Sequence, residues 1–167
     1  LPRLARVGVL WNPTVVDKLV EFRETQPFAT RMGITLQSVE VKAPGDFDAA
    51  FERIRRTRVD AMITLGEPLA FSQLKRIVDF QNQNRIAGIF NWRQAVEAGG
   101  LVAYGPDITD LYQRATVYID KILRGAAPGS LPIEEASKFE MAVNTRTAKA
   151  LGITVPRSVL VRADTVI

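Results

Sequence analysis

The 167-residue chain contains neither cysteine nor histidine. It therefore has no thiol nucleophile, no Ser-His pair and no thiolate or imidazole ligand for a metal ion. The absence of cysteine fits both oxidising and reducing compartments, so it does not locate the protein. We predict a protein that uses neither a metal nor another cofactor.

Three sites that are common in α/β proteins are also missing. The first predicted strand ends in Asn-Pro-Thr and not in the glycine-rich turn of a dinucleotide site, and no P-loop Gly-Lys-Ser/Thr occurs. A phosphoacceptor domain would need acidic residues where Asn12 stands and an aspartate where Gly66-Glu67 stands. The acidic pair Glu134-Glu135 has no partner base. We therefore predict that the chain is not an enzyme.

Long apolar runs are absent too, although 47% of the residues are hydrophobic. No run approaches the roughly 20 residues of a membrane span, and no signal peptide is recognisable. The first predicted strand begins at Arg6, so we interpret the chain as mature protein or an excised fragment. The net charge is +4, but only Arg53, Arg55, Arg56 and Arg58 cluster. On a helix these side chains fan outwards, which favours a solvated face over a nucleic-acid partner.

Short β-branched runs alternate with amphipathic helical segments, which predicts an α/β fold with a doubly wound, mostly parallel sheet. Strands are predicted at 6–11, 34–41, 59–65, 86–90 and 101–104, with helices at 14–32, from Asp46, from Pro68, up to Ala98 and at 107–124. The run at 59–65 is apolar enough for burial on both faces. Residues 1–125 are predicted to form the ligand-binding lobe.

Residues 126–167 differ in sequence pattern from residues 1–125 and are predicted to follow the lobe as a separate segment. A Pro/Gly/Ser-rich connector occupies 126–132, a strand 139–143 and a helix 145–151 that Gly152 ends, before a last helical turn at Pro156.

Ligands of doubly wound sheets bind beyond the carboxyl ends of the strands, which locates the candidate site. We expect the loops at 12–14 and 66–67 to lie next to each other there. Seven residues are candidates for ligand binding: Asn12, Thr14, Glu67, Asn91, Trp92, Tyr104 and Asp107. Structural roles compete for most of them: Asn12, Thr14 and Asp107 as helix caps, Glu67 as the partner of a helix dipole, and Trp92 and Tyr104 as core residues.

The helix at 107–124 carries an apolar stripe of Leu111, Ala115, Tyr118, Ile119 and Ile122. An uncovered stripe of this length is rare in monomers. We expect it to be covered either by docking of the helix on its own sheet or by a second copy of the chain, as a homodimer.

The segments RVGVLWNPT, GEPLAFSQLKRIV and AVEAGGLVAYGPD, followed by DITDLYQRATVYIDKILRGAAPGSLPIEEASKFEMAVNTRTAKALGITVP, occur in this order and span essentially the whole chain. Together they resemble the carboxyl-terminal part of ABC-transporter substrate-binding proteins of the tryptophan/tyrosine-binding type. The resemblance implies one lobe of a type I periplasmic-binding-protein fold, with about 101–125 crossing to the other lobe. It also implies that Asn12, Thr14, Glu67, Asn91, Trp92 and the Tyr104-Gly105 turn face the cleft between the lobes.

The function implied by the resemblance is solute binding for an ABC importer, with a small metabolite such as an amino acid as the ligand. The implied partners are the membrane subunits of the transporter, and the implied location is periplasmic or extracellular, with a lipid anchor on the full-length protein as one form. The alternative is a ligand-sensing regulatory domain of a signalling protein. The two differ in what the complete gene joins to this lobe.

Overall fold

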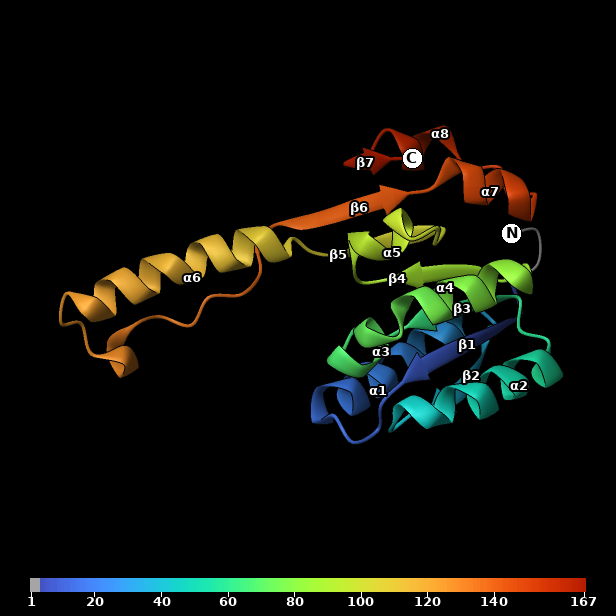
Figure 1. Cartoon of the computed structure of the whole chain (residues 1–167), viewed down its shortest axis with the longest axis horizontal. Coiled ribbons are helices and arrows are strands. Elements are labelled where there is room, and N and C mark those ends of the chain that lie inside the picture. The colour runs from blue at the N-terminus through green and yellow to red at the C-terminus, as the bar shows by residue number, and fades with distance from the viewer. Residues whose placement is uncertain (1–3) are drawn as a thin grey trace.

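The computed structural model describes residues 4–167 as a seven-stranded sheet in the order β2-β1-β3-β4-β5-β6-β7 (Figure 1). All neighbouring strands are parallel except β5 and β6, which confirms the predicted α/β fold with a mostly parallel sheet. The strands are β1 (Arg6–Trp11), β2 (Thr35–Glu40), β3 (Ala61–Thr64), β4 (Ala87–Phe90), β5 (Val102–Pro106), β6 (Phe139–Val143) and β7 (Thr165–Val166). β6 and β7 extend the same sheet as β1–β5, and β7 is a strand that the sequence analysis missed.

The helices lie between the strands in chain order. They are α1 (Val16–Arg31), α2 (Phe47–Thr57), α3 (Pro68–Ser72), α4 (Leu74–Gln83), α5 (Arg93–Glu97), α6 (Ile108–Leu123), α7 (Thr145–Leu151) and α8 (Arg157–Leu160), with 3-10 turns η1 (Pro44–Asp46) and η2 (Pro128–Ser130). The helix predicted from Pro68 onwards is thus divided into α3 and α4 at Gln73. Asp46 does not cap α2, because its carboxylate accepts hydrogen bonds from the backbone N–H groups of Lys42 and Ala43.

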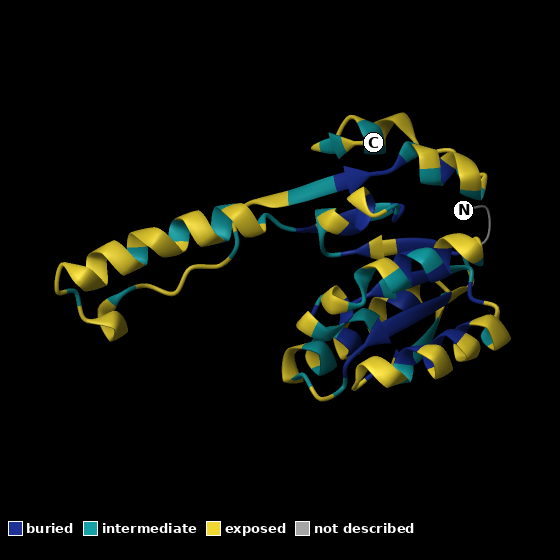
Figure 2. Ribbon diagram, viewed as in Figure 1, coloured by how far each residue is buried: buried dark blue, intermediate teal, exposed yellow. Residues whose placement is uncertain are grey.

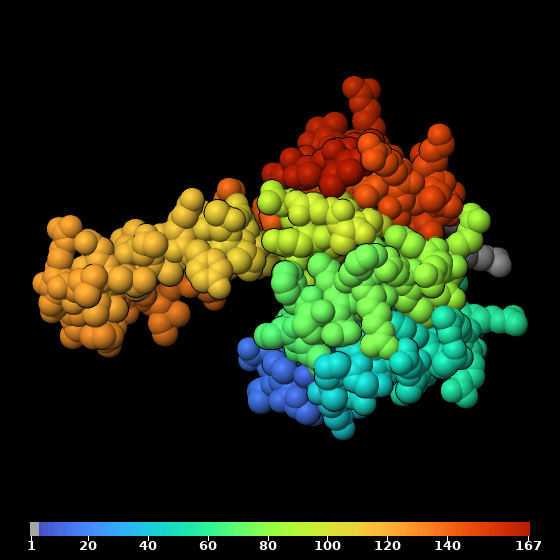
Figure 3. Space-filling model, viewed as in Figure 1, coloured from blue at the N-terminus to red at the C-terminus, as the bar shows by residue number. Residues whose placement is uncertain are grey.

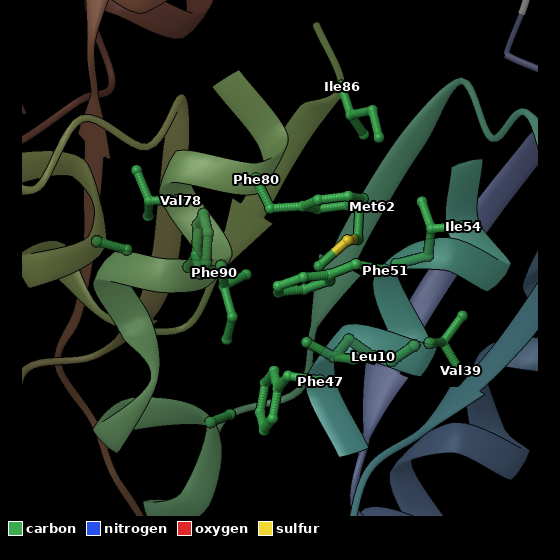
Figure 4. Close-up of a cluster of buried hydrophobic side chains, with 14 of the residues drawn as sticks. Leu10, Val39, Phe47, Phe51, Ile54, Met62, Val78, Phe80, Ile86 and Phe90 are labelled. Carbon is green, nitrogen blue, oxygen red and sulfur yellow. The ribbon is translucent and has the colours of Figure 1, made fainter. Parts of the chain in front are cut away.

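The main core fills one face of the sheet with side chains from α2, α4 and α5 (Figure 4). Phe51 stacks on Phe80 with ring centroids 4.1 Å apart, and Phe47 meets Phe51 edge-on at 5.9 Å. The i, i+3, i+4, i+7 repeat in α2 is what brings Phe47, Phe51 and Ile54 to the same side of that helix, where all three are buried. This face of the fold follows directly from the sequence pattern.

The opposite face is less completely covered. α1 packs there over β1, where Phe22 stacks on Trp11 at 4.6 Å, and α7 covers the far side through Ala148. An apolar hollow of about 260 Å³ on the strands is lined in part by Ala61, Ile63 and Ile89 and by no residue of α1 or α7. The prediction that the third strand is buried on both faces is therefore wrong, because Ala61 and Ile63 are only partly buried.

The strand order reverses between β1 and β3, because the chain moves from β1 outwards to β2 and then returns to β3 on the other side of β1. The ends of β1 and β3 are held together, with the Leu65 N–H donating to the Leu10 carbonyl at 3.0 Å. The adjacency predicted for the loops at 12–14 and 66–67 is thus confirmed. Such a reversal is where doubly wound sheets bind ligands.

α6 and the segment that returns from it, residues 108–137, project from the body as an arm (Figures 1 and 3). No residue of α6 is fully buried, as the mostly exposed arm in Figure 2 shows. The prediction that this helix docks on its own sheet is wrong, because β5 and β6 lead it away from the strand ends. Pairing with a second copy stays a prediction.

The returning segment covers part of the apolar stripe of α6. The Tyr118 hydroxyl donates to the Pro132 carbonyl at 2.8 Å, and the Arg114 guanidinium binds Glu134 and Ser137. A hollow of about 440 Å³ between α6 and the returning segment is lined in part by Leu111 and Ile122. The returning segment therefore covers one side of α6 and leaves the other side exposed.

Candidate functional site

A cavity of about 410 Å³ opens where the carboxyl ends of β3 and β4 meet the base of the arm. Its walls come from the loop after β3, from α3 and α5, and from the first turns of α6. The lining residues are Gly66, Glu67, Pro68, Phe71, Trp92, Gln94, Ile108 and Tyr112. A hollow of about 490 Å³ between α2 and α4 is larger, but it lies on the outer surface of those helices and away from the strand ends.

Glu67 lies at the floor of this cavity and caps α3. Its two carboxylate oxygens accept hydrogen bonds from the N–H groups of Leu69 at 2.9 Å and Ala70 at 2.7 Å, and the residue is only 7% exposed. Pro68 can follow it because the first helical position needs no hydrogen-bond donor. Of the two roles left open by the sequence, the structure shows the one at the helix terminus; a contact with a ligand stays a prediction.

Trp92 and Phe71 form an aromatic wall. Their rings meet edge-on with centroids 5.2 Å apart, and Trp92 also packs against the main core. Gly66 lets this wall come close, because a Cβ atom there would lie 3.0 Å from Asn91 Cβ and 3.1 Å from Trp92 Cζ2. The packing role predicted for Trp92 is thus confirmed, and because the ring also lines the cavity, its contact with a ligand stays a prediction. Asn91 does not line the cavity, and its contact with a ligand stays a prediction.

The opposite wall is a pair of α6 residues that the sequence analysis did not single out. Tyr112 is 74% exposed and Ile108 is 40% exposed, although both line the cavity. They lie four residues apart and so share one face of the helix. The signal for them was present in the sequence: an aromatic residue one turn after an apolar one, directly beyond the Asp107 cap at a strand end. Phe71 was also not predicted, because it lies in a helix only five residues long.

Asn12 and Thr14 are bound to each other at the end of β1. The Asn12 side-chain oxygen accepts hydrogen bonds from the Thr14 N–H at 3.0 Å and the Thr14 hydroxyl at 2.7 Å. The alternative that they cap the next helix is wrong, because α1 begins at Val16 and has no side-chain cap. Neither residue lines the cavity, and their contact with a ligand stays a prediction.

For Tyr104 a core position competed with ligand binding, and the core position is wrong, whereas a contact with a ligand stays a prediction. The side chain is 51% exposed and stacks on Phe139 with centroids 5.8 Å apart. It lies on the sheet face that is only partly covered, because alternation along β5 turns it away from the main core. It does not line the cavity.

Asp107 holds the base of the arm in place. Its carboxylate caps α6 by accepting a hydrogen bond from the Asp110 N–H at 3.2 Å, and it pairs with Lys138 Nζ at 2.7 Å, next to β6. The bond from Lys138, followed by the helix N–H groups, holds the pKa of the Asp107 carboxyl below its usual 3.8. The predicted cap is confirmed, and the geometry fixes the angle at which α6 leaves the sheet.

This lowered pKa predicts a pH dependence of stability. A carboxyl group whose pKa is lower in the folded state stabilises the fold above its ordinary pKa, and this stabilisation is lost as the pH falls below about 3.8 towards the native value. We expect Asp107→Asn to remove this component from the thermal unfolding temperature measured between pH 6 and 2.5. Asp120→Asn, on the same helix and exposed, is the matched control. An unchanged pH profile in Asp107→Asn would show that the pair does not stabilise the arm.

The site has aromatic and apolar walls and a carboxylate that is already bound to backbone groups. Within residues 4–167, no group of three or more acidic side chains is placed to hold a metal ion, and no helix is long and apolar enough to cross a membrane. Such an opening suits a small ligand with a flat apolar part.

The family model described as ABC transporter substrate binding protein matches residues 1–167. The structure is similar to that of a conserved domain protein from Vibrio cholerae, with 26% identity and a TM-score of 0.92 over 100% of this chain and 56% of the other. An ABC domain in complex with L-Trp from Streptococcus pneumonia has 25% identity and a TM-score of 0.89, over 99% of this chain and 57% of the other.

A ligand-free, open structure of a substrate binding protein with adhesive properties from Clostridium difficile shares the fold, at 20% identity and a TM-score of 0.70, over 98% of this chain and 55% of that one. No curated protein matches the chain. The chain thus spans little more than half the length of these solved structures.

Proposed function

Because the chain belongs to the family of ABC transporter substrate-binding proteins, we propose that it is one lobe, the carboxyl-terminal one, of the solute-binding component of an ABC importer. In this proposal a small metabolite binds between the cavity at the strand ends and a second lobe. The membrane subunits of the transporter are the partners, and the site of action is periplasmic or extracellular. The chain performs no chemistry in this role.

The observation that carries the proposal is the continuity between the cavity and the open side of the arm. Ile108 and Tyr112 line the cavity, and Ile119 and Leu123 continue the same helical face at 56% and 80% exposure. The spacing of four, seven and four residues keeps these side chains in one row. A second lobe that covered this row would also close the cavity, and closure around a ligand supplies most of its burial.

An amino acid with an aromatic side chain fits the cavity best. Trp92, Phe71 and Tyr112 offer ring faces and edges to a planar group. The related domain from Streptococcus pneumonia was solved with L-Trp. In our proposal the second lobe supplies partners for the ligand's charged groups, because the Glu67 carboxylate is occupied by the N–H groups of α3.

Calorimetry with L-Trp, L-Tyr and L-Phe tests the proposal. We expect micromolar or tighter binding of at least one of them by the complete two-lobed protein, and binding at least about 100-fold weaker by the present chain, because half of the enclosing surface is missing. A chain that bound as tightly as the complete protein would contradict the interlobe site. A complete protein that bound none of the three would refute the aromatic ligand.

A further inference from the structure

Two helices of this chain end in arginine at a position where glycine is the ordinary residue. Arg58 follows α2 with a φ of 50°, and Arg85 follows α4 with a φ of 55°. Across residues 4–167 they are the non-glycine residues with positive φ, whereas glycines of positive φ follow α1, α5, α6 and α7. A side chain in this conformation is strained, so each arginine costs stability that a glycine would not.

The two arginines lie side by side at the amino-terminal ends of the strands, whereas the cavity lies at the carboxyl-terminal ends. They precede β3 and β4, which are parallel neighbours with Ala61 paired to Ala87. A hydrogen bond from Arg55 Nε to Asn84 Oδ1 at 3.2 Å joins the two helix ends. This edge forms the end of the body that points away from the arm (Figure 3).

Further cations extend the group on both sides. Arg85 Nη2 donates to the Ala150 carbonyl at 3.2 Å, which brings it next to exposed Lys149. On the other side, Arg6 lies beside Asp60, whose N–H donates to the Arg6 carbonyl at 2.9 Å. We call Arg6, Arg56, Arg58, Arg85 and Lys149, all exposed, the basic edge.

Few negative charges oppose the basic edge. The Asp60 carboxylate accepts hydrogen bonds from the N–H groups of Ala5 and Arg6 at 2.9 and 2.7 Å. Among the residues that the structure describes, no carboxylate oxygen lies within 4.0 Å of the guanidinium nitrogens of Arg58 or Arg85. Neither guanidinium group is therefore neutralised by a carboxylate, and apart from the Arg85 Nη2 bond to the Ala150 carbonyl their donors can bind an external anion.

Helix dipoles explain only part of this arrangement. A cation near the carboxyl end of a helix is favourable, but Arg55 and Arg56 already provide that for α2 from ordinary helical positions. For α2 the dipole therefore gives no reason to place Arg58 in the strained conformation that follows, whereas α4 has no basic residue in its last turn and Arg85 is the cation that follows it. Strained residues persist where the side chain has a use, and guanidinium groups bind phosphate oxygens in pairs of hydrogen bonds.

We infer that the basic edge is a docking surface for the anionic phospholipid headgroups of a membrane. This inference rests on the proposed function, because a partner of a membrane transporter works next to a bilayer, where phosphate groups are the polyanion within reach. The cavity is at the opposite edge of the sheet, so a protein docked in this way keeps its ligand site free. Each basic side chain near an anionic bilayer strengthens binding by roughly fivefold.

Vesicle flotation tests the inference. Phosphatidylcholine vesicles with about one third phosphatidylglycerol should bind the chain at low salt, and binding should weaken as salt is raised. The double variant Arg58→Gly/Arg85→Gly should bind at least tenfold more weakly. Its unfolding temperature should be equal to or above that of the wild type, because glycine relieves the strain, so a loss of binding cannot be ascribed to misfolding.

The matched control is Lys42→Ala/Arg124→Ala, which removes the same charge from exposed positions outside the basic edge. The inference fails if the wild type does not bind these vesicles, if the control and the glycine variant weaken equally, or if uncharged phosphatidylcholine binds as well. Tighter binding to a duplex DNA of equal charge concentration than to the vesicles would also overturn it in favour of a nucleic-acid surface. These readouts are independent of calorimetry with amino acids, so the proposed function can fail or hold separately.

Discussion

Gly105→Ala should lower the free energy of unfolding by about 3 kcal/mol or more, a cost at the upper end of that for overpacking in a folded core. A Cβ atom at this position in β5 would lie 2.1 Å from the Asn91 carbonyl oxygen and 2.9 Å from its carbon. The obstacle is backbone, so no side-chain rotation can relieve it. The strand must move away from the loop that carries Trp92, and α6, which follows β5, must move with it.

Chemical denaturation followed by tryptophan fluorescence measures this effect. Gly129→Ala, in η2, is the matched control, because nothing lies within 4 Å of a Cβ atom there. We expect that variant to unfold within about 0.5 kcal/mol of the wild type. If Gly105→Ala did the same, the close approach of β5 to the Asn91 loop would not exist in solution.

Tyr112→Ala should weaken ligand binding by the complete protein by about 10- to 100-fold, if the proposed function holds. Loss of one buried aromatic contact costs about 1.5–3 kcal/mol, which corresponds to that range. Stability should change little, because the side chain is 74% exposed without a ligand. Calorimetry gives the affinity, and thermal unfolding without ligand gives the stability.

Tyr104→Ala is the control that tests where the site is. The residue is exposed like Tyr112 and stacks on Phe139, but it does not line the cavity. We expect it to keep the wild-type affinity within about threefold. If Tyr104→Ala weakened binding as much as Tyr112→Ala, the ligand would bind on the partly covered face of the sheet, and the cavity would be the wrong site.

The sequence by itself determined the order and type of nearly all elements. Short, mostly apolar runs mark strands such as 6–11, and apolar residues recur at i, i+3, i+4 in α2, and both patterns depend on local backbone geometry. The ends of α7 at Asn144 and Gly152 likewise depend only on the local sequence, because a side-chain cap and a left-handed glycine each act within one helical turn. β7 was not predicted, because it has only two residues and is a strand only through its pairing with β6.

The candidate site was predictable only as a place. Strand-helix alternation puts the loops after β1, β3 and β4 at one edge, and Glu67 and Trp92 were found in this way. Whether a side chain there faces a ligand or its own backbone depends on contacts between segments far apart in the chain. Asn12 turned to Thr14, and Tyr104 turned outwards, for reasons that no local pattern contains.

The direction of α6 was decided by the tertiary structure alone. Its apolar stripe indicated an amphipathic helix but not what would cover it, because periodicity is a property of the helix and cover is a property of its neighbours. The antiparallel pairing of β5 with β6 and the Asp107–Lys138 pair at 2.7 Å send the helix away from the sheet. That geometry brings Tyr112 opposite Trp92, and so the second wall of the cavity exists only in three dimensions.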